Sequence, residues 1–159
     1  MTRAYVGLFS ARGDSPGNLR EGLERLRGIG SPGINSDLYR SAPDAAGQPD
    51  CYAMAVRLDT GLDALGLEQA LQTVQTQAAA DRDGDGALEL WLELLAYGDV
   101  ANKRTNFGPS PYRLCERPCV LAALAEIAPD LRLAEKGPTV AELAGERRTL
   151  GRQRRQRPL

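Results

Sequence analysis

The sequence predicts an α+β fold whose elements follow the order β-α-β-β-α-β, with extra helices toward the C-terminus. Apolar runs of strand length, bounded by Gly, Pro and Asp, alternate with longer segments whose leucines recur at helical spacing. The chain has 159 residues, of which 42% are hydrophobic and 26% are charged. This composition is typical of one folded domain and excludes a collagen-like, wholly disordered or disulfide-stapled chain.

The first half of the chain predicts three strands and one helix. Residues 3–10 form a short apolar run, which indicates a buried strand. Ser15 followed by Pro16 marks a helix start, and leucines at helical spacing continue until Gly28. Two further runs predict strands joined by a loop, and they cover residues 34–40 and 52–59.

The second half predicts a helix and then a regular strand. Residues 65–80 carry leucines and a valine on one helical face. From residue 88 to residue 94 leucine occupies every second position, in alternation with Glu89, Trp91 and Glu93. A period of two indicates a strand with one face in the core and the other open to solvent or to a site.

Two helices complete the predicted fold, over residues 117–127 and from the capping box Thr139-Val-Ala-Glu142. The whole order is that of the ferredoxin-like split β-α-β fold, for which we expect one mixed sheet with helices on one side. We find no internal repeat and no linker that would divide the chain.

The charges are unevenly distributed although the net charge is only −1. Residues 147–159 contain six arginines and no acidic residue, so we predict an acidic domain over 1–146 and a basic, disordered tail over 147–159. The tail could contact nucleic acid, but a solvated terminus is the favoured interpretation.

Histidine and cysteine restrict the chemistry. The sequence has no histidine, which excludes Ser-His-Asp triads and imidazole zinc sites. Cys51, Cys115 and Cys119 are an odd set without the second pair that a zinc site needs. Reduced thiols and the lack of a long apolar N-terminal run predict a cytoplasmic protein with no membrane association.

Five segments resemble, in their order along the chain, the 6-hydroxymethyl-7,8-dihydropterin pyrophosphokinases of folate synthesis. The similarity is greatest in the last of the five, and it extends over nearly the whole chain. The segments are AYVGLFS at 4–10, DLYRSAP at 37–43, QPDCY at 48–52, LLAYGD at 94–99 and ERPCVLAALAEIAPDL at 116–131.

The resemblance implies ATP and Mg²⁺ as cofactors. Such enzymes transfer a pyrophosphoryl group from ATP to the pterin hydroxymethyl group, with two Mg²⁺ ions held by a pair of aspartates. Metals and arginines stabilise the charge that spreads over the phosphoryl oxygens. The residues that the resemblance points to are Glu93 and Arg117 as catalytic groups, Gln75, Tyr112, Arg113 and Arg117 for the nucleotide, and Ser41, Tyr52 and Trp91 for the substrate.

The functional positions depart from the family pattern. The metal-binding D-L-D falls on Trp91-Leu92-Glu93, and an indole cannot ligate Mg²⁺. The family's arginine-rich loop corresponds to an acidic turn that begins at Asp83, its histidine corresponds to Pro111, and aromatic pterin contacts correspond to Cys51 and Cys119. We therefore predict a degenerate family member, a pseudoenzyme that binds or scaffolds a small molecule or a partner protein.

The alternative is an ATP-dependent enzyme of altered specificity. Glu93 and the acidic loop carboxylates of Asp81, Asp83 and Asp85 would then hold the metal, with Arg117 on the phosphates. The same loop also matches the start of an EF-hand-type Ca²⁺ loop, although a solvated turn is favoured.

Two further ambiguities stay open. Trp91 either fills the vacated metal site, the favoured interpretation, or stacks on a ligand ring. Arg40, Arg113 and Arg117 either form a phosphate patch or are solvated surface residues.

Overall fold

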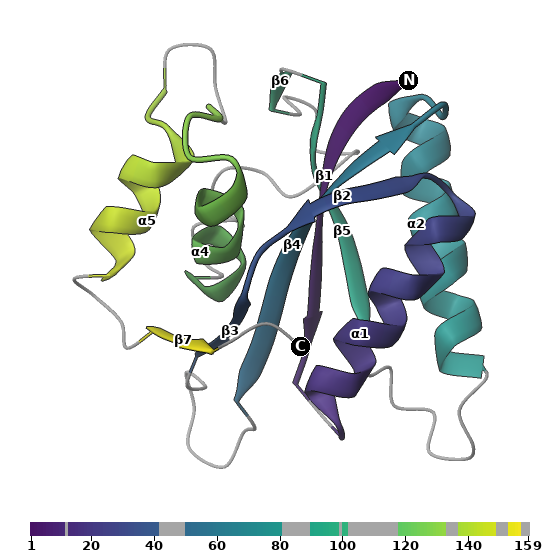
Figure 1. Ribbon diagram of the computed structural model, residues 1–159, viewed down its shortest axis with the longest axis horizontal. Helices are drawn as coiled ribbons and strands as arrows, with labels where there is room; N and C mark the ends of the chain where they lie inside the picture. Colours follow the sequence, from purple (N-terminus) through teal and green to yellow (C-terminus); the bar gives the residue numbers. More distant parts are fainter. Residues whose placement is uncertain are drawn as a thin grey trace.

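The computed structural model describes residues 1–11, 13–41, 50–80, 90–98, 100–101, 118–132, 137–148 and 153–156. The predicted helices and strands occur in the predicted order, and the structure adds short strands that the sequence did not predict (Figure 1). The helices and strands are β1 (Thr2–Ser10), α1 (Ser15–Arg25) with the 3₁₀ turn η1 (Leu26–Gly28), β2 (Ser31–Asn35), β3 (Leu38–Ser41), β4 (Cys51–Thr60), α2 (Ala64–Ala80), β5 (Trp91–Tyr97), β6 (Val100–Ala101), α4 (Pro118–Ile127), α5 (Val140–Arg148) and β7 (Gln153–Gln156).

The strands of the described residues form one sheet in the order β6-β5-β1-β4-β3-β7, and β2 also pairs with β4. Each of these strand pairs is antiparallel. The helical crossovers α1 and α2 join strands that are not neighbours, because β4 lies between β1 and β3, and β1 lies between β4 and β5. The predicted α+β class and ferredoxin-like arrangement are confirmed.

Helices cover both faces of the sheet, which corrects the expectation of helices on one side. In Figure 1, α1 and α2 lie on one side of the strands and α4 and α5 on the other. The cause is visible in β4, where Ala53, Met54, Ala55 and Val56 are all buried. A strand that is apolar on both faces must be covered on both. We refer below to the α1/α2 face and the α4 face.

The two cores divide the strand residues by alternation. Leu8, Met54 and Leu92 pack against α1 and α2, whereas Phe9 and Ala53 belong to the core under α4 and α5. Helix α4 is buried along Val120–Leu124, between the sheet and α5.

The helix starts agree with the sequence signals. The Asp14 side chain caps α1 by accepting the N–H of Gly17 at 3.2 Å. Thr139 caps α5 by accepting the N–H of Glu142 through its Oγ1 at 3.2 Å, as the capping box predicts.

The run 34–40 is not one strand, which corrects that prediction. The pairing register shifts between Pro32 and Asn35, and Ser36 is buried between β2 and β3. The Ser36 Oγ accepts the N–H of Ala55 at 2.9 Å and donates to the carbonyl of Asp37 at 2.7 Å. The Ser36 side chain thus satisfies backbone hydrogen-bonding groups where the strand pairing is interrupted. The hydrophobic pattern of the sequence does not indicate this interruption.

The alternating strand lies within the predicted segment, and its pairing contains an irregularity. It begins at Trp91 and continues to Tyr97. A register shift between Tyr5 and Val6 leaves Leu95 as an extra residue in β5, so Leu94 and Leu95 are both buried. A bulge of this kind breaks the period of two that marked the strand in the sequence.

The predicted tail also needs a correction. Within 147–159, residues Gln153–Gln156 form β7, an edge strand paired with β3. Backbone hydrogen bonds to an open sheet edge form whatever the side chains are, so arginine content does not exclude a strand there. Among the described residues, no helix has the length and apolar character needed to cross a membrane.

Candidate functional site

The candidate site lies on the α4 face along β5 and β1. Trp91 and Glu93 project from this face, since Leu92 between them enters the core under α1 and α2. Across the strand pair, Phe9 lies opposite Trp91 and Gly7 lies opposite Glu93. The central strand of the sheet therefore supplies the residues that flank the two candidate side chains.

The rings of Phe9 and Trp91 form an offset stack. Their centroids are 6.1 Å apart and their planes differ by 8°. This arrangement is one of the favoured geometries of aromatic pairs, because the negative face of one ring avoids the face of the other. Trp91 nevertheless stays 45% exposed, so Phe9 supports the indole without covering it.

Glu93 is half-buried, and its Oε2 atom is shielded from solvent. The backbone opposite it is held close to α4: a Cβ on Gly7 would lie 3.2–3.3 Å from the side chains of Leu95 and Val120. Glu93 therefore sits at the margin between the covered and the open part of the α4 face.

The described residues do not fit a pair of Mg²⁺ ions. Glu93 is the one carboxylate that β5 offers, and Trp91 occupies the adjacent position on that face. No group of three or more Cys, Asp or Glu side chains that could hold a metal occurs in the described ranges. The other candidate metal and nucleotide residues lie outside the described residues: Asp81, Asp83, Asp85, Tyr112, Arg113 and Arg117.

Gln75, a candidate nucleotide contact, makes a backbone contact in this structure. Its Oε1 accepts the N–H of Leu92 at 2.9 Å. Because α2 packs on the α1/α2 face, this bond fastens β5 to the helix between the two candidate side chains, Trp91 and Glu93. Its predicted role toward a nucleotide stays a prediction.

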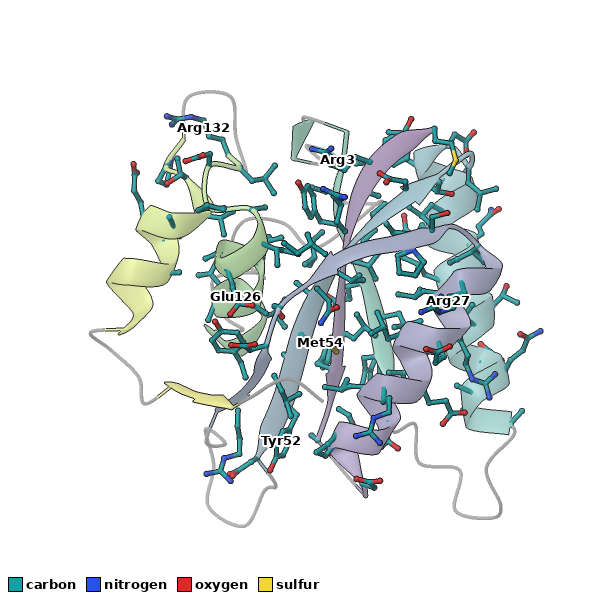
Figure 2. The ribbon with its side chains drawn as sticks, viewed as in Figure 1. Arg3, Arg27, Tyr52, Met54, Glu126 and Arg132 are labelled. Atoms are coloured by element: carbon teal, nitrogen blue, oxygen red, sulfur yellow. The ribbon has the colours of Figure 1, made fainter. Side chains whose placement is uncertain are left out.

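Tyr52 lies on the other face of the sheet. It packs against the core under α1 and α2, at the end of β4 where Figure 2 labels it. Its cross-strand neighbour is Arg40, whose Nε lies 3.4 Å from the Oδ2 of Asp50. A hydrogen bond with Tyr52 and the charge of Asp50 raise the pKa of Arg40 above its ordinary value. Arg40 therefore interacts with its neighbours Tyr52 and Asp50.

The three candidate substrate contacts do not come together on one face. Trp91 projects from the α4 face and Tyr52 from the α1/α2 face. Ser41 ends β3, where its backbone pairs with Cys51 and Gln153. Successive side chains of a strand point to opposite faces of the sheet. The position of Tyr52 in the register of β4 therefore places it on the face opposite to that of Trp91.

Sequence reasoning missed two residues that shape this region. Phe9 supports Trp91, a pairing that depends on strand register. Glu126 on α4 accepts the Tyr39 hydroxyl at 3.0 Å and the N–H of Asp37 at 2.5 Å, and so ties α4 to β3 (Figure 2). Neither contact leaves a local sequence signal, because the partners are far apart along the chain.

Comparisons with known proteins agree with this architecture. The structure is similar to Plasmodium falciparum HPPK-DHPS, wild type, with SDX-DHP, at a TM-score of 0.69 and 9% identity over 92% of this chain. The same Plasmodium protein with STZ-DHP gives a TM-score of 0.69. The chain spans 44% and 43% of those longer chains. At such low identity the likeness concerns the fold.

Sequence comparisons identify the family. The chain is 35% identical, over 89% of its length and 91% of the relative, to the 2-amino-4-hydroxy-6-hydroxymethyldihydropteridine pyrophosphokinase of Methylorubrum extorquens. It is 31% identical, over 84% of its length and 85% of the relative, to the protein of that name from Pseudomonas aeruginosa. A family model matches residues 5–129. The chain belongs to the 7,8-dihydro-6-hydroxymethylpterin-pyrophosphokinase (HPPK) family.

Proposed function

We propose that this family member retains the fold but has lost diphosphate transfer, and that it binds or scaffolds a small molecule or a partner protein. The observation that supports this proposal is the pair Trp91 and Glu93 on one face of β5. An indole stands where the resemblance implies a metal-binding carboxylate.

The chemistry explains why this exchange matters. Two carboxylates spaced by one residue on a strand point to the same face about 6–7 Å apart, a spacing suited to a shared metal pair. Mg²⁺ requires oxygen ligands in a near-octahedral arrangement, and an indole offers none. Without metals to neutralise it, the charge that develops on the transferred phosphoryl group is poorly stabilised.

The Plasmodium structures support the proposal that the chain acts with a partner protein. Those chains are described as HPPK-DHPS, and the part that resembles this chain is less than half of each. An HPPK-type domain can therefore work beside a second domain, and a scaffolding role is compatible with a fold kept intact.

The test combines calorimetric titration of Mg·ATP with an assay for AMP release in the presence of 6-hydroxymethyl-7,8-dihydropterin. We expect no turnover by the full chain. Trp91→Asp, which restores the second carboxylate, is expected to increase Mg·ATP affinity. Turnover by the unaltered chain at a rate that Glu93→Gln abolishes would overturn the proposal.

One observation favours a second function, an ATP-dependent diphosphotransferase of altered specificity. Relatives that are 35% and 31% identical are named as pyrophosphokinases, and the matches cover most of the chain. In this alternative Glu93 and the carboxylates of Asp81, Asp83 and Asp85 hold Mg²⁺, and Arg117 contacts the phosphates.

The two functions differ in what Glu93 does. The alternative requires micromolar Mg·ATP binding that Glu93→Gln abolishes. Asp130→Asn is a matched control, since Asp130 is an exposed carboxylate beyond the C-terminal end of α4. Binding that both variants retain would count against a metal role for Glu93.

A further inference from the structure

We propose that a groove between the start of β1 and the end of α4 binds a small organic anion, which has an apolar body and ends in carboxylate or phosphate oxygens. The groove has a volume of about 410 Å³. This volume lies within the usual size range of ligand pockets. Arg3 and Tyr5 of β1, Gly98 after β5, and residues 127–132 line it.

The groove is separate from the site described above along β1 and β5. Arg3 and Phe9 stand six residues apart on β1. At the rise of an extended strand, roughly 20 Å therefore separates the groove from the Phe9–Trp91 pair. Figure 2 shows Arg3 and Arg132 at one end of the molecule and Tyr52 at the other. The inference therefore goes beyond the proposed function and does not depend on Trp91.

The inner wall of the groove is apolar. Tyr5, Ile127 and Leu131 line the groove and are partly buried against the core under α4 and α5. Each of them keeps part of its surface open to solvent. A ligand with a ring or a hydrocarbon portion would remove this surface from water, which favours binding. An inorganic ion would leave the apolar wall in contact with water.

Backbone hydrogen bonds hold both walls of the groove in place. On the strand side, the N–H of Gly98 donates to the carbonyl of Arg3 at 2.7 Å, in a turn where Gly98 has a φ of +69°. On the helix side, the N–H of Val140 donates to the carbonyl of Leu131 at 2.7 Å. Walls that are already fixed lose little freedom when a ligand binds, so less of the binding energy is lost to ordering.

Two arginines supply the positive charge of the groove. Arg3 is exposed, and neither Arg3 nor Arg132 forms an ion pair with another described residue. The Nη1 of Arg132 donates to the carbonyl of Gly137 at 2.5 Å. Because a carbonyl has no net charge, this bond orients the guanidinium without neutralising it. Guanidinium groups bind carboxylate and phosphate oxygens through two parallel hydrogen bonds.

The carboxylates nearby restrict the ligand to one anionic end. Asp130 also lines the groove, and Asp59 lies opposite Arg3 in the strand register. The lining therefore combines two positive charges with one negative charge. A polyphosphate would bring several negative charges close to these carboxylates, which repel them. A ligand with a single acidic group at the end of an apolar body avoids this repulsion.

Four probes separate the apolar part of the ligand from its charge. Phenylacetate and phenyl phosphate carry both, benzyl alcohol lacks the charge, and inorganic phosphate lacks the ring. Amide chemical shifts of the ¹⁵N-labelled full chain report where each probe binds. We expect saturable shifts at Gly98 and Leu131 with at least one of the two anionic ring compounds, and none at Trp91. Benzyl alcohol and inorganic phosphate should bind at least about 10-fold more weakly. The tighter anionic ring compound identifies the acidic group.

Arginine variants test which side chains hold the anion. Arg3→Gln removes the charge of an exposed side chain, and we expect the affinity for the tighter probe to fall about 10-fold. Arg132→Lys keeps the charge but loses the planar fork, so a smaller loss is expected. Arg27→Gln is the matched control, since Arg27 lies on η1 beyond α1 and pairs with Glu24 (Figure 2). Its affinity should equal that of the parent.

Three results would overturn the proposal. The first is the lack of shifts at Gly98 and Leu131 with both anionic ring compounds, including the case in which shifts occur only at Trp91. The second is equal affinity of the parent and of Arg3→Gln for the tighter probe. The third is binding of benzyl alcohol as tight as that of phenylacetate and phenyl phosphate. Loss of diphosphate transfer is measured by AMP release, so the proposed function can fail or hold independently of this groove.

Discussion

The side-chain carbonyl of Gln75 accepts the backbone N–H of Leu92 at 2.9 Å. Within the described chain, β6 pairs with β5 only at Ala96 and Tyr97, so the outer edge of β5 at Leu92 faces no strand there. Gln75 of α2 thus satisfies the backbone N–H of Leu92 at the edge of the sheet. This hydrogen bond holds β5 in place between Trp91 and Glu93.

Removing this acceptor should cost stability. We expect Gln75→Leu to lower the free energy of unfolding by about 1–2 kcal/mol, because the Leu92 N–H loses its partner in a part-buried position. Gln75→Glu keeps an acceptor and should cost less. Urea denaturation measures both, and Gln72→Leu, an exposed glutamine one turn earlier on α2, should be nearly neutral. An equal effect at both positions would contradict the edge-fixing role.

Glu126 should be the main polar anchor of α4 on the sheet. Glu126→Ala removes the acceptor for both the Tyr39 hydroxyl and the Asp37 N–H, so we expect a loss of about 2–3 kcal/mol of unfolding free energy. A double-mutant cycle with Tyr39→Phe should give a coupling energy of at least ~0.5 kcal/mol. Additive effects of the two substitutions would show that the contact does not contribute.

Gly7 should resist enlargement because α4 lies against it. A Cβ there would lie 3.2–3.3 Å from side-chain carbons of Leu95 and Val120, and the larger Val requires α4 or β5 to move. We expect Gly7→Val to lower the free energy of unfolding by about 1–3 kcal/mol, with a smaller loss for Gly7→Ala. Gly61→Ala is the control, since a Cβ at Gly61 meets nothing within 4 Å. Thermal denaturation measures the stability of each variant. A Gly7→Val variant that is as stable as the parent would contradict the close approach of α4 to Gly7.

Glu68 should make stability depend on pH. Burial raises the pKa of this carboxyl above its ordinary value, so the folded state disfavours the ionised form. The cost is absent while Glu68 is protonated in both states, and it appears as pH rises through the unfolded and then the folded pKa. We expect Glu68→Gln to be more stable than the parent at neutral pH and no more stable at pH below the ordinary value. Urea denaturation across that interval tests the sign, and a pH-independent difference would contradict it.

Much of the fold could be predicted because its signals are local. The helix start at Ser15-Pro16 and the capping box at Thr139 depend on backbone groups within one turn, and both are found where expected. The break at Ser36 and the bulge opposite Tyr5 could not be predicted, since each depends on which strand lies alongside. The alternation of hydrophobic residues predicts which face of the sheet a side chain lies on only where the strand pairing is regular.

The sequence by itself determined the order of the main helices and strands up to β5 and the resemblance to the family, both of which follow from residue types in a line. Only the tertiary structure decided that Tyr52 and Trp91 lie on opposite faces, that α4 covers the second face, and that Phe9 supports the indole. The physical reason is that strand pairing brings together residues such as Phe9 and Trp91, which are far apart along the chain. Their contact energy therefore depends on register and packing and is absent from any local pattern.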